Sequence, residues 1–227
     1  MRILKNVWEA ICGASLMFIL IILPCLRSKL RRWGSTEGEL GRELPGDELV
    51  KNVKGWYNHA ITIKAAPADV WPWIVQLGQN KGGFYTYELL ENIAGCKIHN
   101  AAAIVSEFQG TKVGDKVMMH PKAAPYIVAV IDPGRAFVLR LRFNLENNET
   151  VDAAEPLPPK YQDSSWLFFV EEMADGTTRM ITRSRNDWTQ SKTNTFFYGL
   201  FGIISLVMDR KMLKGIRKRA EKSAKSV

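Results

Sequence analysis

The chain has 227 residues, 46% of them hydrophobic and 24% charged, which is typical of one substantial globular domain. That length can bury a full core without disulfide or metal staples, and no repeat period or Gly/Pro excess indicates a fibrous or disordered protein. The net charge of +8 lies at the ends: residues 1–32 hold six Lys/Arg against one acid, residues 209–227 hold eight against two, and the remainder carries −3. This distribution favours a membrane surface, and we expect no nucleic-acid partner.

The first predicted element is a transmembrane helix. Ala10 to Leu26 gives 17 residues without a charge, about 25 Å of helix against a hydrocarbon layer of about 30 Å. Val7 and Trp8 extend it, and Trp8 suits the interfacial aromatic belt. A cleaved signal sequence is the main alternative, but the run ends at Pro24-Cys25 without the usual small-residue cleavage site.

Lysines and arginines set the expected orientation. Two precede the run, whereas four follow it, which places the carboxy-terminal side in the cytoplasm. We therefore expect a single-pass membrane protein with a cytoplasmic domain. Cys12 and Cys25 lie in or beside the run and leave Cys96 alone, so no disulfide framework is predicted. The residues expected to contact the membrane here are Trp8, Arg27, Lys29, Arg31 and Arg32.

We predict three parts: an anchor with its basic flank over residues 1–32, a linker over 33–54, and a domain over 55–227. The linker is rich in Gly and Glu and contains a Pro45-Gly46 turn signal. The domain opens with a strand over 56–64, rich in aromatic and β-branched residues. Pro67 then starts a helix that ends near Gly78, and a second short helix covers 84–94.

The period next changes to that of strands and finally to that of a long helix. The helix is predicted over 195–221 because apolar residues recur there every three or four positions. The fold class is therefore α+β, with an antiparallel sheet of about six to seven strands wrapped around a long C-terminal helix, plus an N-terminal transmembrane helix. The later strands are predicted at 104–108, 116–120, 126–132, 136–143, 164–171 and 177–185, with a loop over 146–160.

Three segments resemble the helix-grip superfamily, which includes START lipid-transfer domains, birch-pollen-allergen proteins and polyketide cyclase-like proteins (SRPBCC). They are Ile61–Gly78, which carries the pattern A-P-x-x-V-W, then Gly82–Glu88 (GGFYTYE) and Met208–Ile216 (MDRKMLKGI). The last two also look like an uncharacterised bacterial branch. The resemblance covers about residues 55–221. It implies a space between sheet and final helix that is commonly a ligand cavity, but it fixes no single function.

Aromatic residues are expected to line this cavity. Alternation places Phe137 with Leu139 on one strand face, and Trp166 with Phe168 on another. The expected ligand is a hydrophobic or lipid-like small molecule, and the alternative is a filled core. Arg183 and Arg185 are candidates for holding an anionic head group, the alternative being cross-strand ion pairs on the solvent face. The remaining lining candidates are Trp73, Tyr85, Tyr87, Phe197 and Phe201.

The sequence contains no hydrolase elbow, P-loop, zinc-ligand spacing or dinucleotide fingerprint, so we expect neither a metal nor a cofactor. The leading hypothesis is a membrane-anchored binding protein. The second is a cyclase- or hydrolase-like enzyme using the same cavity. The third is a structural partner in a membrane complex, which predicts a filled core and an exposed apolar patch. The loose catalytic candidates are Tyr85, Tyr87, Glu88, Asp115 and His120.

The end of the chain is a basic helix tail. Beside the anchor, such a tail predicts a second contact with anionic lipid, worth about 1 kcal/mol for each basic residue at the surface. A solvated helix end, favoured by the helix dipole, is the alternative. The tail residues expected to contact the membrane are Lys214, Lys218 and Lys222.

Overall fold

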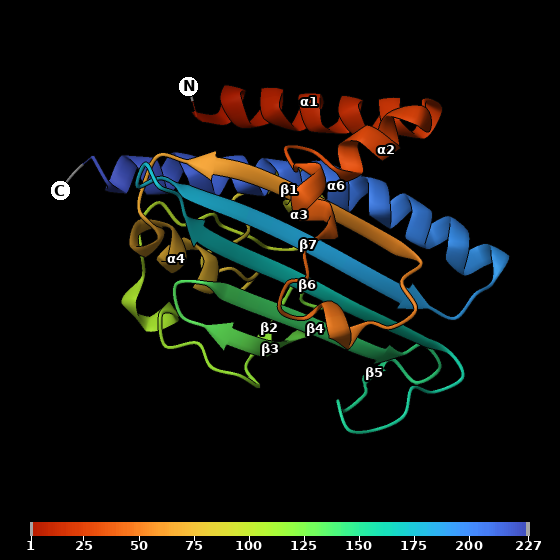
Figure 1. Cartoon of the computed structure of the whole chain (residues 1–227). Helices are drawn as coiled ribbons and strands as arrows, with labels where there is room; N and C mark the ends of the chain where they lie inside the picture. The colour runs from red at the N-terminus through yellow and green to blue at the C-terminus, as the bar shows by residue number, and fades with distance from the viewer. Residues whose placement is uncertain (1, 226–227) are drawn as a thin grey trace.

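The computed structural model describes residues 2–225 as one antiparallel sheet with helices on one face and at the amino terminus (Figure 1). The strands are β1 (Gly55–Ile63), β2 (Lys116–Val117), β3 (Tyr126–Asp132), β4 (Ala136–Asn144), β5 (Glu149–Thr150), β6 (Tyr161–Glu172) and β7 (Thr178–Trp188). They are ordered β1-β7-β6-β4-β3-β2, with β5 paired to β4. The helices are α1 (Arg2–Ile22), α2 (Cys25–Arg31), α3 (Glu37–Gly41), α4 (Pro67–Val75), α5 (Glu88–Ile93) and α6 (Lys192–Ser223), with 3-10 turns η1 (Asp47–Leu49) and η2 (Ser106–Phe108). The predicted α+β class, with an antiparallel sheet and a long C-terminal helix, is confirmed.

The inner face of the sheet, defined as the face toward α6, carries the main core. Phe137 lies opposite Phe168, and Leu139 lies opposite Trp166, so the aromatic faces of β4 and β6 meet side by side. Residues of α6 that recur at helical spacing close this layer from the other side. These buried residues of α6 are Leu206, Met212, Leu213, Ile216 and Ala220.

Local contacts explain where the elements differ from the sequence-based prediction. The predicted strand over 104–108 is wrong, because the Gln76 side chain accepts the Val105 amide at 3.1 Å and the chain turns into η2 instead of joining the sheet. Helix α4 ends at Val75 rather than near Gly78 because Gly78 forms a bridge with Gly83. The second predicted helix shortens to α5.

Helix α1 lies antiparallel to α6, and the two ends of the chain are near each other in the view of Figure 1. Its buried or half-buried residues form a single stripe at spacings of three and four, which is the face that a straight helix offers to a neighbour. Within the described residues, one helix, over Leu4–Ile22, is long and apolar enough to cross a membrane, and only 17% of that stretch is buried. The stripe consists of Asn6, Glu9, Ala10, Gly13, Leu16, Met17 and Leu20.

The segment predicted as a linker over 33–54 is not a free connector. Residues 34–49, here called the outer strap, cover the outer face of the sheet, the face opposite α6 (Figure 1). Leu44 of the strap packs with Val138 and Leu167, which point outward between the inward-facing aromatic residues. A capping box at Thr36 starts α3 within the strap. Because both faces of the sheet are covered, its strands are apolar on both sides.

Candidate functional site

In the space predicted as a ligand cavity, buried side chains pack against one another. Six of the predicted lining residues do lie between the sheet and α6, and they contact one another there. The ring centroids of Trp166 and Phe168 are 4.7 Å apart, and those of Trp73 and Tyr85 are 5.8 Å apart. These six buried residues are Trp73, Tyr85, Phe137, Leu139, Trp166 and Phe168.

The clearest hollows among the described residues are instead shallow and lie at the surface. One, of about 500 Å³, is lined by residues 190–196 at the start of α6. The other, of about 300 Å³, lies beside β5 and the loop that follows it. Neither hollow is lined by any of the residues expected to bind a ligand.

Three other predicted lining residues lie away from the interior. Phe197 and Phe201 are 50% and 59% exposed on the first turns of α6, before the helix comes under α1. Tyr87 packs against α1, where a Cβ added at Gly13 would lie 3.0 Å from its ring. These placements contradict the prediction that all three residues line a cavity.

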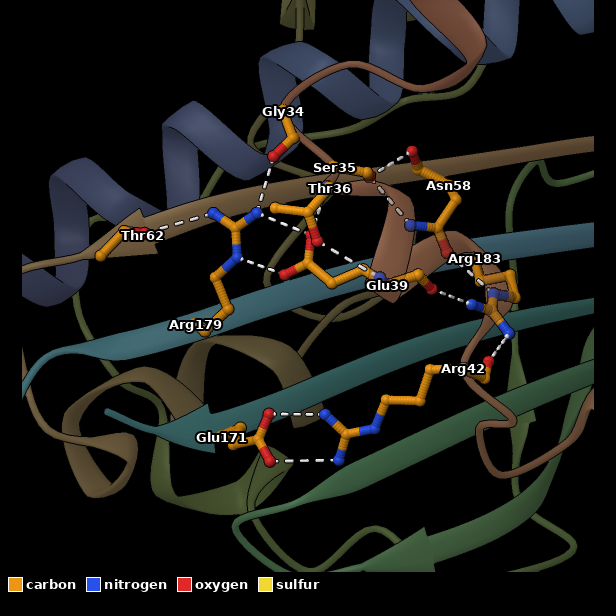
Figure 2. A network of polar contacts seen from close by, with 10 residues as sticks. All are labelled: Gly34, Ser35, Thr36, Glu39, Arg42, Asn58, Thr62, Glu171, Arg179 and Arg183. Atoms are coloured by element: carbon orange, nitrogen blue, oxygen red, sulfur yellow. Dashed lines mark hydrogen bonds and ion pairs between the residues drawn. The ribbon is translucent and has the colours of Figure 1, made fainter. Parts of the chain in front are cut away.

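Arg183 and Arg185 were candidates for an inward-facing anion site, and this prediction is also wrong. Both lie on the outer face of β7 and pair with Asp47, at the end of the outer strap. The Arg183 guanidinium also donates to the Asn58 side chain at 2.8 Å, and to the main-chain oxygens of Arg42 and Glu39 (Figure 2). All of its nitrogens are therefore bound within the chain.

Two more arginine–glutamate pairs hold the outer strap to the sheet (Figure 2). Arg42 of the strap binds Glu171 of β6 through two hydrogen bonds, of 2.7 and 3.1 Å. Arg179 of β7 binds Glu39 of the strap through another two, of 2.6 and 2.9 Å. The Arg42 hydrogen bonds hold the pKa of Glu171 below its ordinary value, so this carboxyl stays ionised. The late-strand arginines thus serve the fold.

A buried polar cluster joins β1, β7 and α6. His59 is fully buried, and its Nδ1 lies 2.6 Å from Asp209 while its Nε2 lies 2.8 Å from the carbonyl oxygen of Leu30. Both ring nitrogens of His59 therefore have a polar partner, one on α6 and one at the end of α2. Thr182 donates to the same carboxylate at 2.7 Å, and Tyr57 donates at 3.4 Å.

This cluster explains one of the segments that carry the family resemblance. Asp209 belongs to the MDRKMLKGI segment, and its partner His59 lies on the strand just before the A-P-x-x-V-W pattern. Two features of the sequence mark this pair: His59 alternates with Tyr57 along the strand, and Asp209 ends an uncharged run.

The remaining resemblance residues pack against one another. A Cβ added at Gly215 of α6 would lie 2.4 Å from the carbonyl oxygen of Tyr85, so only glycine allows the helix this close. The Tyr85 hydroxyl accepts from Gln76 at 2.8 Å, and the Arg219 guanidinium lies 4.4 Å from its ring centre. Burial raises the pKa of Tyr85 to about 12, which keeps the hydroxyl protonated. The GGFYTY segment forms the loop before α5, and these contacts hold that loop against the final helix.

The loose catalytic candidates do not converge. Glu88 accepts the Asn100 amide at 3.0 Å, Asp115 accepts the Lys112 amide at 2.8 Å, and His120 lies 3.2 Å from the carbonyl oxygen of Ala94. Each is held by the main chain in its own loop. The structure does not bring any two of them together as an acid and a base.

The most prominent surface feature is the outward face of α1. It is uncharged from position 7 to position 22, and Trp8 at its start is 67% exposed. The only acid in the helix, Glu9, lies on the inward stripe and pairs with Lys211 of α6 at 2.9 Å. This is the reverse of a solvated surface helix, which turns its charges outward. The exposed large apolar residues here are Leu4, Val7, Trp8, Ile11, Phe18, Ile19, Ile21, Ile22, Leu23 and Leu26.

Basic residues border this face at one end. Lys5 and Lys218 are close enough that Lys5 lowers the pKa of Lys218. Lys214 lies 5.6 Å from the Trp33 ring and is exposed, as are Lys218 and Lys222.

The basic flank after α1 makes a mixed set of contacts. Lys29 and Arg31 are exposed. Arg27 donates to the carbonyl oxygens of Leu20 and Ile21, which end α1, and Arg32 pairs with Glu37. Only part of the predicted membrane-contact set is therefore free to face lipid.

Comparisons with known proteins show likeness in fold only. No model of a known protein family matches the sequence, and no curated protein matches it. Solved structures that are similar include a protein from Mesorhizobium loti (11% identity, TM-score 0.41, covering 74% of this chain and 98% of that one). A protein from Arthrobacter aurescens is similar at 15% identity and a TM-score of 0.40, over 76% of this chain and 90% of the other. At these identities and scores the matches say nothing about function.

Proposed function

We propose that this chain is a membrane-attached protein of the helix-grip type that acts at the bilayer surface through its exterior. The observation that carries the proposal is the outward face of α1, which is large, apolar and uncharged. Soluble monomers rarely expose a contiguous apolar patch of this kind unless it meets a partner or a membrane. The resemblance of three segments to SRPBCC proteins supports the helix-grip assignment, and the cytoplasmic side is the one favoured by the lysine and arginine count.

The packed interior supports a surface role over an enclosed ligand. A structural partner in a membrane complex was expected to combine a filled core with an exposed apolar patch, and the packed core and the apolar face of α1 support that reading. The titratable side chains that enzymatic readings would use are scattered and bound to the main chain. We therefore place the activity of the protein in what its surface contacts.

Co-sedimentation of the full chain with phospholipid vesicles tests this proposal. The variant Ile11→Glu/Phe18→Glu puts two charges on the outward face of α1, and we expect it to abolish sedimentation with vesicles. The control Val113→Glu/Met173→Glu makes the same changes at exposed apolar positions in loops far from α1, and should sediment like the parent chain. Sedimentation of both variants to the same extent would refute the proposal.

A second candidate is binding of a hydrophobic or lipid-like molecule within the layer between sheet and α6. The supporting observation is that the indole N–H groups of Trp73 and Trp166 are buried there without a hydrogen-bond partner among the described residues. A buried unpaired donor costs about 1–3 kcal/mol, which a ligand with an acceptor atom would relieve. Native mass spectrometry of the detergent-purified protein tests this: a co-purified small molecule supports it, and a bare chain refutes it.

A further inference from the structure

We propose that α1 lies in the plane of an anionic bilayer surface as an interfacial helix, docked on α6, and does not cross the membrane. This inference rests on the proposed membrane attachment and adds how the helix is held. The partner is the headgroup region of a lipid bilayer that contains anionic lipids. The protein side is the outward face of α1, extended by Phe196 at the start of α6 and by Lys214 and Lys218 further along it.

The first argument is that the inward stripe of α1 is already occupied. Leu20 is buried against Ile203 and Val207 of α6, and Gly13 lets the Tyr87 ring approach closely. Glu9 pairs with Lys211 on the same stripe. A helix that spans the bilayer would leave these contacts or would take α6 into hydrocarbon with it.

The composition and contacts of α6 exclude its insertion into hydrocarbon together with α1. The helix carries seven lysines and arginines from position 210 onward, and its other side packs against the sheet. Moving charged side chains of this number into hydrocarbon costs about 2.5 kcal/mol or more for each. With α1 docked as observed, the long axis of α1 must therefore run along the membrane surface.

Helical geometry places Phe196 and Lys214 on the same side of α6 as α1. Phe196 and Lys214 are eighteen residues apart, which is five full turns at about 3.6 residues per turn, so they share a face of α6. Ile203 and Val207, seven and eleven residues after Phe196, belong to the same face and pack against α1. Phe196 is exposed beyond the carboxy-terminal end of α1, and Lys214 and Lys218 are exposed beside its amino-terminal half.

Charge selects the type of lipid. Lys5 of α1 lies beside Lys218 of α6, and the nearest acid on α1, Glu9, is engaged by Lys211. An apolar face bordered by basic side chains is the pattern by which interfacial helices bind anionic membranes. Anionic headgroups would relieve the repulsion between the two lysines.

The position of the two ends of α1 tests the inference. The full chain, diluted from detergent onto preformed vesicles of phosphatidylcholine and phosphatidylserine, is treated with a membrane-impermeant maleimide. One variant keeps Cys25, just after α1, and carries Cys12→Ser and Cys96→Ser. The other carries Lys5→Cys, at the exposed basic border of the apolar face, with all three native cysteines replaced by serine. We expect both ends to react fully without added detergent, because both lie on the outer surface.

The other outcomes separate the interfacial orientation of α1 from membrane attachment itself. Protection of the Lys5→Cys thiol until the vesicles are dissolved would show that α1 spans the bilayer, which refutes the inference and leaves membrane attachment intact. Failure of either variant to sediment with vesicles would refute the proposed function itself. A stable dimer in the absence of vesicles, with no sedimentation, would assign the apolar face to a second copy of the chain.

A charge-reversal pair tests the lipid specificity. Lys214→Glu/Lys218→Glu should weaken binding to the anionic vesicles at least about tenfold, since each basic residue near such a surface contributes about 1 kcal/mol. The control Lys112→Glu/Lys122→Glu has the same net charge, but its residues flank β2 at the opposite edge of the sheet from β1, and it should bind like the parent. Equal binding of the parent chain to neutral and anionic vesicles would refute the anionic selectivity.

Discussion

Replacing Glu91 by glutamine should remove a loss of stability that the parent chain undergoes as the pH rises. Glu91 is buried on α5, where Thr86 donates to one carboxylate oxygen and the other has no partner among the described residues. Burial raises the pKa of Glu91 from 4.5 to about 7, with the Thr86 hydrogen bond opposing the shift and Glu88 adding to it. The folded chain therefore holds a proton that the unfolded chain releases at lower pH.

The sign and size follow from this difference. Between about pH 4.5 and pH 7 the folded state binds the extra proton, so the free energy of unfolding falls as the pH rises through that window. Each pKa unit corresponds to about 1.4 kcal/mol, which gives a loss of about 3 kcal/mol by pH 8. Glutamine does not titrate. The advantage of Glu91→Gln over the parent should therefore grow by about 3 kcal/mol between pH 4 and pH 8.

Urea unfolding in mild detergent, followed by tryptophan fluorescence at several pH values, measures this advantage. Glu107→Gln is the matched control, because it makes the same change at an exposed position of η2. Parallel stability profiles for the parent and Glu91→Gln would refute the argument from burial. A free energy of unfolding that rises with pH in the parent chain alone would show that the Glu91 pKa is shifted in the opposite direction.

Three further substitutions test the packing. Asp209→Ala removes the hydrogen-bond partner of the buried His59, Thr182 and Tyr57 side chains and should lower the free energy of unfolding by about 3 kcal/mol or more, since each unsatisfied buried group costs about 1–3 kcal/mol; a loss below about 1 kcal/mol in urea unfolding would contradict this network. Gly215→Ala should destabilise by about 1–3 kcal/mol although alanine favours helices, because its Cβ would meet the Tyr85 carbonyl; a raised melting temperature would disprove the close approach. Trp166→Ala should cost about 3–5 kcal/mol and open a cavity that binds a small apolar probe, and unchanged stability would show that the site collapses without cost.

The sequence predicted the class and most elements because their periodicities are strong. The predicted strand over 126–132 matches β3, and the final helix is longer than predicted by only a few residues at each end. Alternation correctly grouped the aromatic residues within β4 and within β6 on shared faces. The short strand predicted over 104–108 failed because one long-range side-chain contact, from Gln76, decided its conformation.

The assignment of Arg183 failed for a different physical reason. Ile181 shares its strand face, and an apolar neighbour suggested that this face turns toward the core. In the fold this face turns toward the outer strap, where Ile181 is buried with Leu44 and Val138. Alternation shows which residues share a face, but a sheet buried on both sides gives no local signal of which face is which. The strap itself is rich in Gly and Glu, as linkers are.

The orientation of α1 was present in the sequence as a weaker signal than its hydropathy. Glu9, Gly13 and Met17 step by four, which marks one stripe containing the only acid of the helix and a small residue. Such a stripe favours close packing against another helix. Hydropathy averaged along the segment hides it, because the average does not distinguish one face from another.

The antiparallel contact of α1 with α6 also sets an order of events during synthesis. Leu20 leaves the ribosome 183 residues before Ile203, its contact on α6. At about 5–20 residues per second, α1 is complete roughly 10 to 40 s before its docking helix exists. For that interval its whole circumference is uncovered, so it must be held by the bilayer or by a chaperone. Because β1 likewise waits for β7, the proposed attachment makes the membrane the first partner of this chain, with the domain completed upon it.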